Sequence, residues 1–338
     1  MVYRRLAGER PRMFPISHST LDARALAEEI DARYDLGGRC HCELLARGVN
    51  DIYLVRAAQT RFVMQAWRSD MYEPEEVLYE LEYMRHLDTK GIHVASPQPA
   101  TNGALFFSLN APEGARPVAL FAWAEGAPLS ASPATERAAD LGAHVAKLHA
   151  ASAGFAPTAA RFRNDAARLR ERLPALLRMV GGRPGEDQFY RHAIETVANA
   201  MDALGAEGLP RGPTHGDIQI ENILVSDAGR MTVIDFDDCG EDHLMNDLAC
   251  FLWRNEYQNV DPAIGEAFVQ GYSQVRPLTE REQALMPLFI ADRDLYIAVG
   301  IATMVNVIGH SAIGYTHDFD WYRTAIERHM TAAGLPVP

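Results

Sequence analysis

The chain has 338 residues, 48% of them hydrophobic, and carries 45 Asp and Glu against 32 Lys and Arg, a formal net charge of −13 at pH 7. This length predicts about two domains with a sizeable core, and the composition excludes disordered, collagen-like and disulfide-rich classes of protein. The acidic balance argues against nucleic acid and anionic membranes as partners, because like charges repel at long range.

Targeting and membrane signals are weak in this sequence. The basic segment at 1–12 is not followed by the apolar run of a signal peptide. The most apolar stretch, 285–308, is interrupted by Asp292, Arg293 and Asp294. Its uninterrupted part is too short to span a bilayer, so we expect a buried helix there.

The cysteine spacing predicts neither a disulfide framework nor a zinc site, because no CxxC pair is present. We expect reduced thiols and a cytoplasmic location. The sequence leaves the oligomeric state open. The four cysteines are Cys40, Cys42, Cys239 and Cys250.

The first third of the chain predicts a small antiparallel sheet. Residues 1–20 are expected to form a loosely packed arm, and helical spacing follows at 21–34. β-rich runs then alternate with turns, and one helix begins at Pro74, where Pro and two following Glu suit a helix N-terminus. The predicted strands lie at 51–56, 61–67, 104–109 and 118–123.

The chain becomes mainly helical after the break at 125–128. Helices are predicted around 141–152 and at 165–180, 187–204, 262–272, 280–308 and 319–333, with one β-rich island at 222–226 and 231–236. The fold class is therefore α+β, with a small antiparallel-sheet N-lobe at 21–123 and a larger, mainly helical C-lobe at 124–338. The cleft between the lobes is the expected site.

The densest group of acids surrounds the β-rich island. Nine acids and one cation, Arg230, lie between His215 and Asp247, so a compensating cation is expected, and Mg²⁺ suits hard oxygen ligands. Asn222 follows Asp217 by five residues, and Asp235 ends a strand thirteen residues later. A base Asp with an Asn and a second Asp as metal ligands is the minimal set for phosphoryl transfer.

Two motifs carry a resemblance to a known family. His215-Gly-Asp-Ile-Gln-Ile-Glu-Asn222 followed by Val233-Ile-Asp-Phe-Asp-Asp-Cys-Gly240 resembles the aminoglycoside phosphotransferase/choline kinase family, an offshoot of the protein-kinase fold. The resemblance covers roughly residues 40–255 and is greatest to the bacterial branch of homoserine kinase and the stress-response kinases. It implies a protein-kinase-like bilobal fold and ATP and Mg²⁺ as cofactors.

The resemblance also implies roles for individual residues. Asp217 would be the catalytic base, and Asn222 and Asp235 the magnesium ligands. The segment from Phe121 through Trp123 to Ala124 would be the hinge that meets adenine through its backbone.

On the phosphate side, Gly48 and Asn50 would lie in the loop over the phosphates. Glu80 would match the glutamate that pairs with a strand cation. Where the family has that Lys or Arg, this chain has Gln65, which can donate a hydrogen bond but supplies no charge. Arg68 points to the opposite face of an ideal strand, so it could compensate only if the strand ends or bulges.

Two further residues of the motifs, His215 and Asp237, are expected at most to support the site. His215 is expected to support the catalytic loop through hydrogen bonds. Asp237 either assists the metal or belongs to a solvated acidic turn.

The leading hypothesis is an ATP- and Mg²⁺-dependent phosphotransferase that acts on a hydroxyl of a small molecule. Asp292 and Asp294 suit an amine-bearing acceptor such as an amino alcohol, amino acid or aminoglycoside, although both could instead be salt-bridged. One alternative is a catalytically weak or inactive nucleotide-binding regulator, suggested by Gln65. Another is a protein Ser/Thr kinase, which the lack of a long activation segment after Asp235 disfavours.

Overall fold

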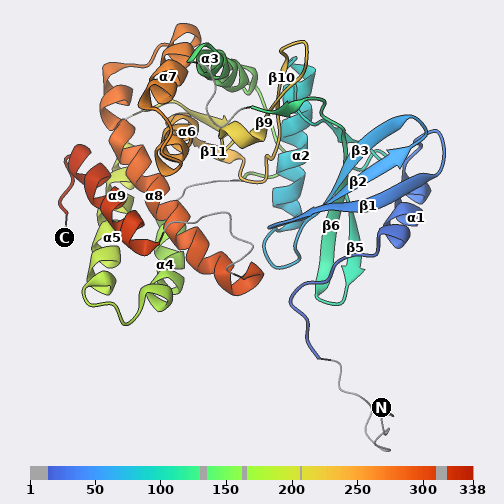
Figure 1. The fold of residues 1–338 in the computed structure, drawn as a ribbon, viewed down its shortest axis with the longest axis horizontal. Helices are drawn as coiled ribbons and strands as arrows, with labels where there is room; N and C mark the ends of the chain where they lie inside the picture. The colour runs from blue at the N-terminus through green and yellow to red at the C-terminus, as the bar shows by residue number, and fades with distance from the viewer. Residues whose placement is uncertain (1–13, 130–134, 162–165, 206–207, 310–317, 338) are drawn as a thin grey trace, which may run out of the picture.

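The computed structural model shows two lobes, one built on an antiparallel sheet and one mainly helical (Figure 1). The predicted α+β class and its division into a β-rich and a helical part are confirmed. The structure describes residues 14–129, 135–161, 166–205, 208–309 and 318–337.

The N-lobe sheet has the order β1-β2-β3-β6-β4, with β5 also paired to β6, and the pairs are antiparallel. All four predicted strands are present, and the strand before them and the short β4 are additional. Their bounds are β1 Cys40–Arg47, β2 Asp51–Ala57, β3 Thr60–Ala66, β4 Pro97–Gln98, β5 Phe107–Ala111 and β6 Gly114–Ala122.

Two helices cover opposite faces of this sheet, α1 (Ala23–Arg33) and α2 (Pro74–Thr89). Alternation along β3 shows this, because Met64 packs in the cluster with α1 whereas Val63 packs against the cluster with α2. In Figure 1, α2 lies between the sheet and the helical lobe. Gln65 shares the face of Val63 and is therefore on the side of the lobe junction.

The segment before α1 is bound to the N-lobe, contrary to the expectation of a loosely packed arm at its 17–20 end. The Ser19 N–H and hydroxyl donate to Glu113 at 2.9–3.1 Å, and His18 Nε2 lies 3.0 Å from Asp51. Asp51 also pairs with the buried Arg116 at 2.9 Å. These polar side chains lie at the end of β2 that follows residues 48–50, and they fix the segment there.

The C-lobe contains seven helices in the part of the chain that the structure describes, and the predicted helices are all found within a few residues. Short strands at β7, β8 and β11, and helix α6, were not predicted. The helices are α3 Thr135–Ala151, α4 Ala166–Val180, α5 Glu186–Leu204, α6 Met245–Tyr257, α7 Pro262–Val275, α8 Glu280–Ile308 and α9 Phe319–Ala332. The remaining elements are β7 Ala127–Pro128, β8 Arg211–Thr214, η1 Ile220–Asn222, β9 Ile223–Val225, β10 Met231–Val233 and β11 Gly240–His243.

The missed strands are short and pair with distant segments. β7 joins β9 and β10 in one small sheet, and β8 pairs with β11 in another. A two-residue strand such as Ala127–Pro128 has no periodicity to detect, so only the tertiary pairing defines it.

Helices α3 and α7 approach each other so closely that only glycine fits at two positions. A Cβ at Gly142 would lie 1.9 Å from the carbonyl oxygen of Phe268, and one at Gly271 would lie 1.9 Å from that of Ala139. Both neighbours are backbone atoms, which cannot move aside as a flexible side chain can. The pair therefore fixes the spacing of the two helices.

We expect Gly271→Ala to lower the free energy of unfolding by at least about 2 kcal/mol, because the added methyl overpacks the helix contact. Chemical denaturation monitored by circular dichroism measures this change. Gly300→Ala is the matched control: this glycine also lies inside a helix, but a Cβ added there would meet no atom within 4 Å. There alanine should be neutral or stabilise by up to about 1 kcal/mol. Equal effects of the two substitutions would contradict the packing argument.

The apolar stretch at 285–308 lies in α8, a helix that the other C-lobe helices bury, as predicted. No helix in the described part of the chain is both long and apolar enough to cross a membrane. Asp292 and Asp294 are 1% and 0% exposed. Asp294 accepts a hydrogen bond from Trp253 Nε1 at 2.7 Å and lies 2.6 Å from His329. Their expected role in binding an amine is therefore not supported, because neither carboxyl reaches the surface.

Asp292 makes the folded state sensitive to pH. Neither of its carboxyl oxygens has a hydrogen-bond partner among the described residues, and burial raises its pKa to about 7, although Arg293 opposes this. Asp242 is a second buried acid close enough to interact with Asp292, and the two carboxylates repel each other when both are charged. Between the unfolded and folded pKa values, the folded chain holds a proton that the unfolded chain has released.

We therefore expect stability to fall as pH rises from about 4 to 7, with a cost of up to about 4 kcal/mol from this one group. Asp292→Asn should flatten the fall, since an amide does not titrate. Urea unfolding of both proteins across that pH range measures the slopes. If the variant keeps the slope of the unaltered protein, the pH dependence has another origin.

Candidate active site

His215 supports the loop that follows β8. Its ring is fully buried; Nε2 donates to the carbonyl of Ile234 at 3.0 Å, and Nδ1 accepts from the Asp217 N–H at 3.2 Å. The Ile234 N–H in turn donates to the carbonyl of Asn222 at 3.0 Å. These bonds bring the loop of Asp217, the helix η1 of Asn222 and the strand end before Asp235 into one cluster.

Asp217 is held by donors on both carboxylate oxygens. Oδ1 accepts from Arg293 on α8 at 2.6 Å and has the Cys250 thiol at 3.7 Å. Oδ2 accepts from Gln219 at 2.7 Å and Asn222 at 3.0 Å. The carboxylate therefore has a fixed orientation and a cation beside it. Sequence reasoning missed Arg293, whose only signal was a charge inside an apolar helix.

Asp247, in the first turn of α6, anchors the loop that contains His215, Gly216 and Asp217. Its oxygens accept from the N–H groups of His215 at 3.0 Å and Gly216 at 2.8 Å, and from His149 Nε2 at 2.8 Å. Burial disfavours the charged form, yet the hydrogen bonds from His149 and the His215 N–H hold the pKa of Asp247 below its usual range. The sequence did not reveal this role, because nothing in it links Asp247 to His149 on α3.

Gly216 allows the catalytic loop to touch the following acidic loop. It has a φ of +82°, and a Cβ there would lie 2.0 Å from the carbonyl oxygen of Asp238. Asp235 itself has a φ of +66°, a left-handed conformation that is uncommon outside glycine. Backbone strain of this kind concentrates at functional sites.

The carboxylates around Asp235 repel one another. The neighbouring Asp237 and the partly desolvated setting raise the pKa of Asp235 well above its ordinary value, and the charges of Asp217 and Glu80 add to this. Asp237 accepts hydrogen bonds from Tyr72 at 3.1 Å and Asn50 at 3.3 Å. A bound cation would relieve this repulsion.

The donor chemistry suits Mg²⁺ shared with a nucleotide. No three His, Cys, Asp or Glu side chains in the described residues converge tightly enough to hold a metal alone. Magnesium sites in kinases instead use one or two protein oxygens and complete the shell with phosphate and water. Asp235 and the amide oxygen of Asn222 fit that incomplete set.

The expected phosphate loop reaches across the lobe junction. The Gly48 N–H donates to the carbonyl of Asn50 at 3.1 Å, which closes the turn between β1 and β2. Asn50, 7% exposed, then contacts Asp237 of the C-lobe. Two expected site residues that lie 187 positions apart are thus in direct contact.

The expected hinge lies where β6 ends. The Phe121 ring faces inward and packs near Trp67, so only its backbone could meet a base. Arg61 lies over the Trp123 ring at 4.4 Å and donates to Glu125 at 2.9 Å. Trp123 is therefore stacked by Arg61 in this structure.

Arg68 does not replace the missing strand cation. The strand does end before it, at Ala66, but its guanidinium donates to Asp70 at 3.2 Å and to the Ser17 carbonyl at 3.4 Å. Glu80, 2% exposed on α2, has Arg161 of the C-lobe at 4.0 Å. No sequence motif singles out Arg161, because only the tertiary fold brings it to Glu80.

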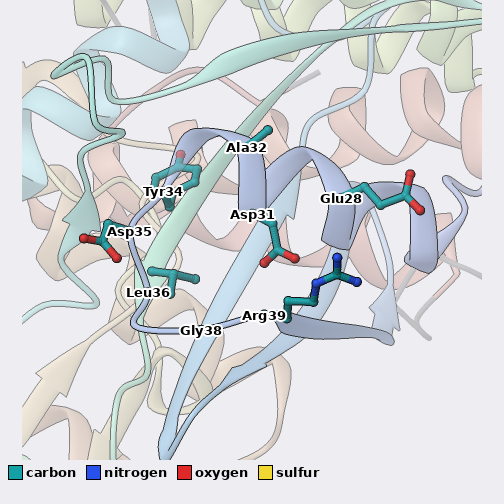
Figure 2. A pocket seen from close by; sticks show the side chains of 8 residues that line it. All are labelled: Glu28, Asp31, Ala32, Tyr34, Asp35, Leu36, Gly38 and Arg39. Atoms are coloured by element: carbon teal, nitrogen blue, oxygen red, sulfur yellow. The ribbon is translucent and has the colours of Figure 1, made fainter.

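A surface hollow on the other side of the N-lobe is not this site (Figure 2). It is lined by α1 and the loop to β1, on the face of the sheet opposite α2. Two of its three acids accept hydrogen bonds from the backbone: Asp31 from the Cys40 N–H at 2.9 Å, and Asp35 from the Gly37 N–H at 3.3 Å. The hollow is a product of how this loop turns.

Comparison with known sequences identifies the family. The family model described as "Phosphotransferase enzyme family" matches residues 41–285. The chain belongs to this family. The resemblance inferred from the two motifs is thereby confirmed.

Similar proteins of this family come from several bacteria. An uncharacterized protein of Deinococcus radiodurans is 32% identical over 308 residues, covering 90% of this chain and 89% of that protein. A homoserine kinase of Neisseria meningitidis serogroup B is 32% identical over 265 residues, covering 75% and 80%. The phosphotransferase therefore aligns with these relatives over most of its length.

Solved structures share the fold. A microcompartment-associated aminopropanol kinase has a TM-score of 0.68 at 24% identity, covering 92% of this chain and 95% of that one. An amicoumacin kinase in complex with AMP-PNP and Ca²⁺ has a TM-score of 0.67 at 17% identity, covering 93% of both. The kinase-like bilobal fold of this phosphotransferase is confirmed.

We expect Asp247→Ala to lower the free energy of unfolding by about 3–5 kcal/mol, because it leaves the N–H groups of His215 and Gly216 and the ring of His149 without their acceptor. Denaturant titration measures the loss. Asp261→Ala is a control that removes one exposed helix-cap bond and should cost about 1 kcal/mol. A comparable small loss for Asp247→Ala would show that Asp247 is not the anchor of the loop.

Proposed function

We propose that this phosphotransferase transfers the terminal phosphoryl group of ATP to a hydroxyl of a small molecule, with Asp217 as the base. The observation that carries the proposal is the fixed Asp217 carboxylate, which Arg293, Gln219 and Asn222 hold at the junction of the lobes. A base must be aimed before the reaction begins, since positioning supplies much of the catalysis in phosphoryl transfer.

The proton follows a short path in this proposal. The acceptor hydroxyl approaches Asp217, donates its hydrogen bond to the carboxylate and passes its proton there as the new O–P bond forms and the bond to ADP breaks. Four donors surround the carboxylate, and Gln219 is the most exposed of them. The acceptor hydroxyl takes the place of Gln219, whereas Arg293 keeps its hydrogen bond to Oδ1 and holds the carboxylate in position.

Nucleotide and metal would be held from both lobes. The loop of Gly48 and Asn50 would cover the phosphates, and the backbone from Phe121 to Trp123 would meet the base. Asn222 and Asp235 would hold Mg²⁺, which neutralises charge on the phosphates when bound. AMP-PNP and Ca²⁺ in the similar amicoumacin kinase support ATP and a divalent ion.

The acceptor side carries charges of both signs. Arg293 lies at Asp217, and Asp238 accepts from the Tyr296 hydroxyl at 3.0 Å three residues along the same helix face. A hydroxylated amino acid has both an anionic and a cationic group, so this surface supports it over a polycationic aminoglycoside. The homoserine kinase relatives agree with this choice. An ADP-release screen with homoserine, aminopropanol, choline and an aminoglycoside ranks the acceptors.

We expect Asp217→Asn to lower kcat by about 10²–10⁴-fold, the usual contribution of a general base, while nucleotide binding persists. ADP release with the best acceptor gives the rate, and calorimetry gives ATP-analogue binding. Asp227→Asn, an exposed acid of the neighbouring turn, is the control and should keep full activity.

The contrary outcomes separate two alternatives. Full activity of Asp217→Asn would remove Asp217 as the base. A protein that binds ATP but phosphorylates no acceptor, with or without Gln65→Lys, would favour the nucleotide-binding regulator. Phosphorylation of protein Ser or Thr in preference to every small molecule would favour the protein-kinase alternative.

A further inference from the structure

Arg161 lies at the junction of the two lobes, in the chain between α3 and α4. Its side chain is 1% exposed, although arginine is rarely buried without charged or hydrogen-bonding partners. The backbone is fixed as well, because the Arg161 carbonyl accepts from the Glu241 N–H of β11 at 2.7 Å. The residue is therefore a rigid part of the C-lobe.

The Arg161 guanidinium meets α2 of the N-lobe at two successive turns. Nε lies 3.7 Å from the Glu76 carboxylate, and one terminal nitrogen lies 4.0 Å from Glu80. The same nitrogen donates to the Glu76 carbonyl at 3.5 Å. A C-lobe cation thus lies beside the glutamate that the family resemblance pairs with a cation on the N-lobe strand.

The other side of the guanidinium meets the loop after Asp235. The second terminal nitrogen donates to the carbonyl of Asp237 at 2.6 Å, two residues beyond the expected metal ligand. The first also lies 3.7 Å from the Cys239 sulfur. Burial by itself lowers the pKa of Arg161, but the electrostatic influence of Cys239, Glu80 and Glu76 raises it above its ordinary value, so the group stays cationic.

The planar guanidinium of Arg161 therefore joins α2 to the loop after Asp235, which we call the metal loop. A lysine in the place of Gln65 would bind Glu80 from within the N-lobe and leave the metal loop to other contacts. The forked donors of arginine can satisfy both at once, which a point charge cannot. The bridge also places a positive charge among acids that repel one another.

We propose that Arg161 is a positioning residue for the divalent metal. Arg161 takes the place of the strand cation as the partner of Glu80, and it fixes the loop that carries Asp235. The inference rests on the proposed function, in which Asp235 is a metal ligand. It explains how a chain with Gln65 keeps α2 and the metal loop in register: the cation comes from the opposite lobe.

Calorimetric titration of a non-hydrolysable ATP analogue at a series of Mg²⁺ concentrations tests this role. We expect Arg161→Gln to raise the half-saturating Mg²⁺ concentration by about tenfold or more, the usual effect of losing a residue that orients a metal ligand. Metal-free ADP binding should be unchanged, since Arg161 touches neither the hinge nor the phosphate loop in the described contacts. With an acceptor, kcat should fall while the KM for the acceptor stays constant.

Two further variants keep the test decisive. Arg161→Lys retains the charge but cannot span Glu80 and Asp237, so it should fold and show the same shift in Mg²⁺ dependence; it carries the comparison if Arg161→Gln fails to fold. Arg170→Gln, which loses exposed pairs to Glu195 and Asp202, is the control and should match the unaltered protein.

Wild-type Mg²⁺ dependence in a folded Arg161 variant would overturn the inference alone. Absence of nucleotide binding by the unaltered protein would instead overturn the proposed function.

Discussion

One buried carboxylate, Asp247, holds the centre of this molecule together. It accepts hydrogen bonds from the N–H groups of His215 and Gly216 and from the ring of His149, and so joins the catalytic loop to α6 and α3. The position of Asp217 depends on these bonds, because Asp217 follows Gly216 directly. The charge is costly to bury and is retained because three donors meet it.

Around this anchor, the site accumulates negative charge that the fold must manage. Asp217, Asp235, Asp237 and Glu80 influence one another electrostatically. Cationic and amide side chains from distant elements meet them, among them Arg293 from α8, Arg161 from the chain after α3, and Asn50 from the N-lobe. The lobes are thus joined by polar contacts that converge on the acidic loop and by apolar packing, in which Tyr83 of α2 contacts Phe155 and Phe236 of the C-lobe.

Much of this arrangement could be predicted from the sequence, and the failures have physical causes. Helical periodicity located α8 and α5 within one residue, and the spacing of Asp217, Asn222 and Asp235 predicted a cluster that the fold brings together. The sequence did not reveal His149, Arg161 or Arg293 as partners of the site, because each comes from a distant segment and only tertiary packing brings it close. Asp292 and Asp294 misled for a related reason: a charge within a helix does not show which way it faces, and both point inward while Arg293 between them meets Asp217.

The short segment from Ser17 to Thr20 has a practical meaning for work on this enzyme. Its contacts with Asp51 and Glu113 make it part of the frame that carries Asn50, although it precedes the first helix and looks like a dispensable tail. Arg116 donates to the Ser19 carbonyl at 2.9 Å and would lose that acceptor in a chain trimmed to the start of α1. Expression boundaries and fusion tags are therefore best placed before residue 14, so that the N-lobe keeps these contacts.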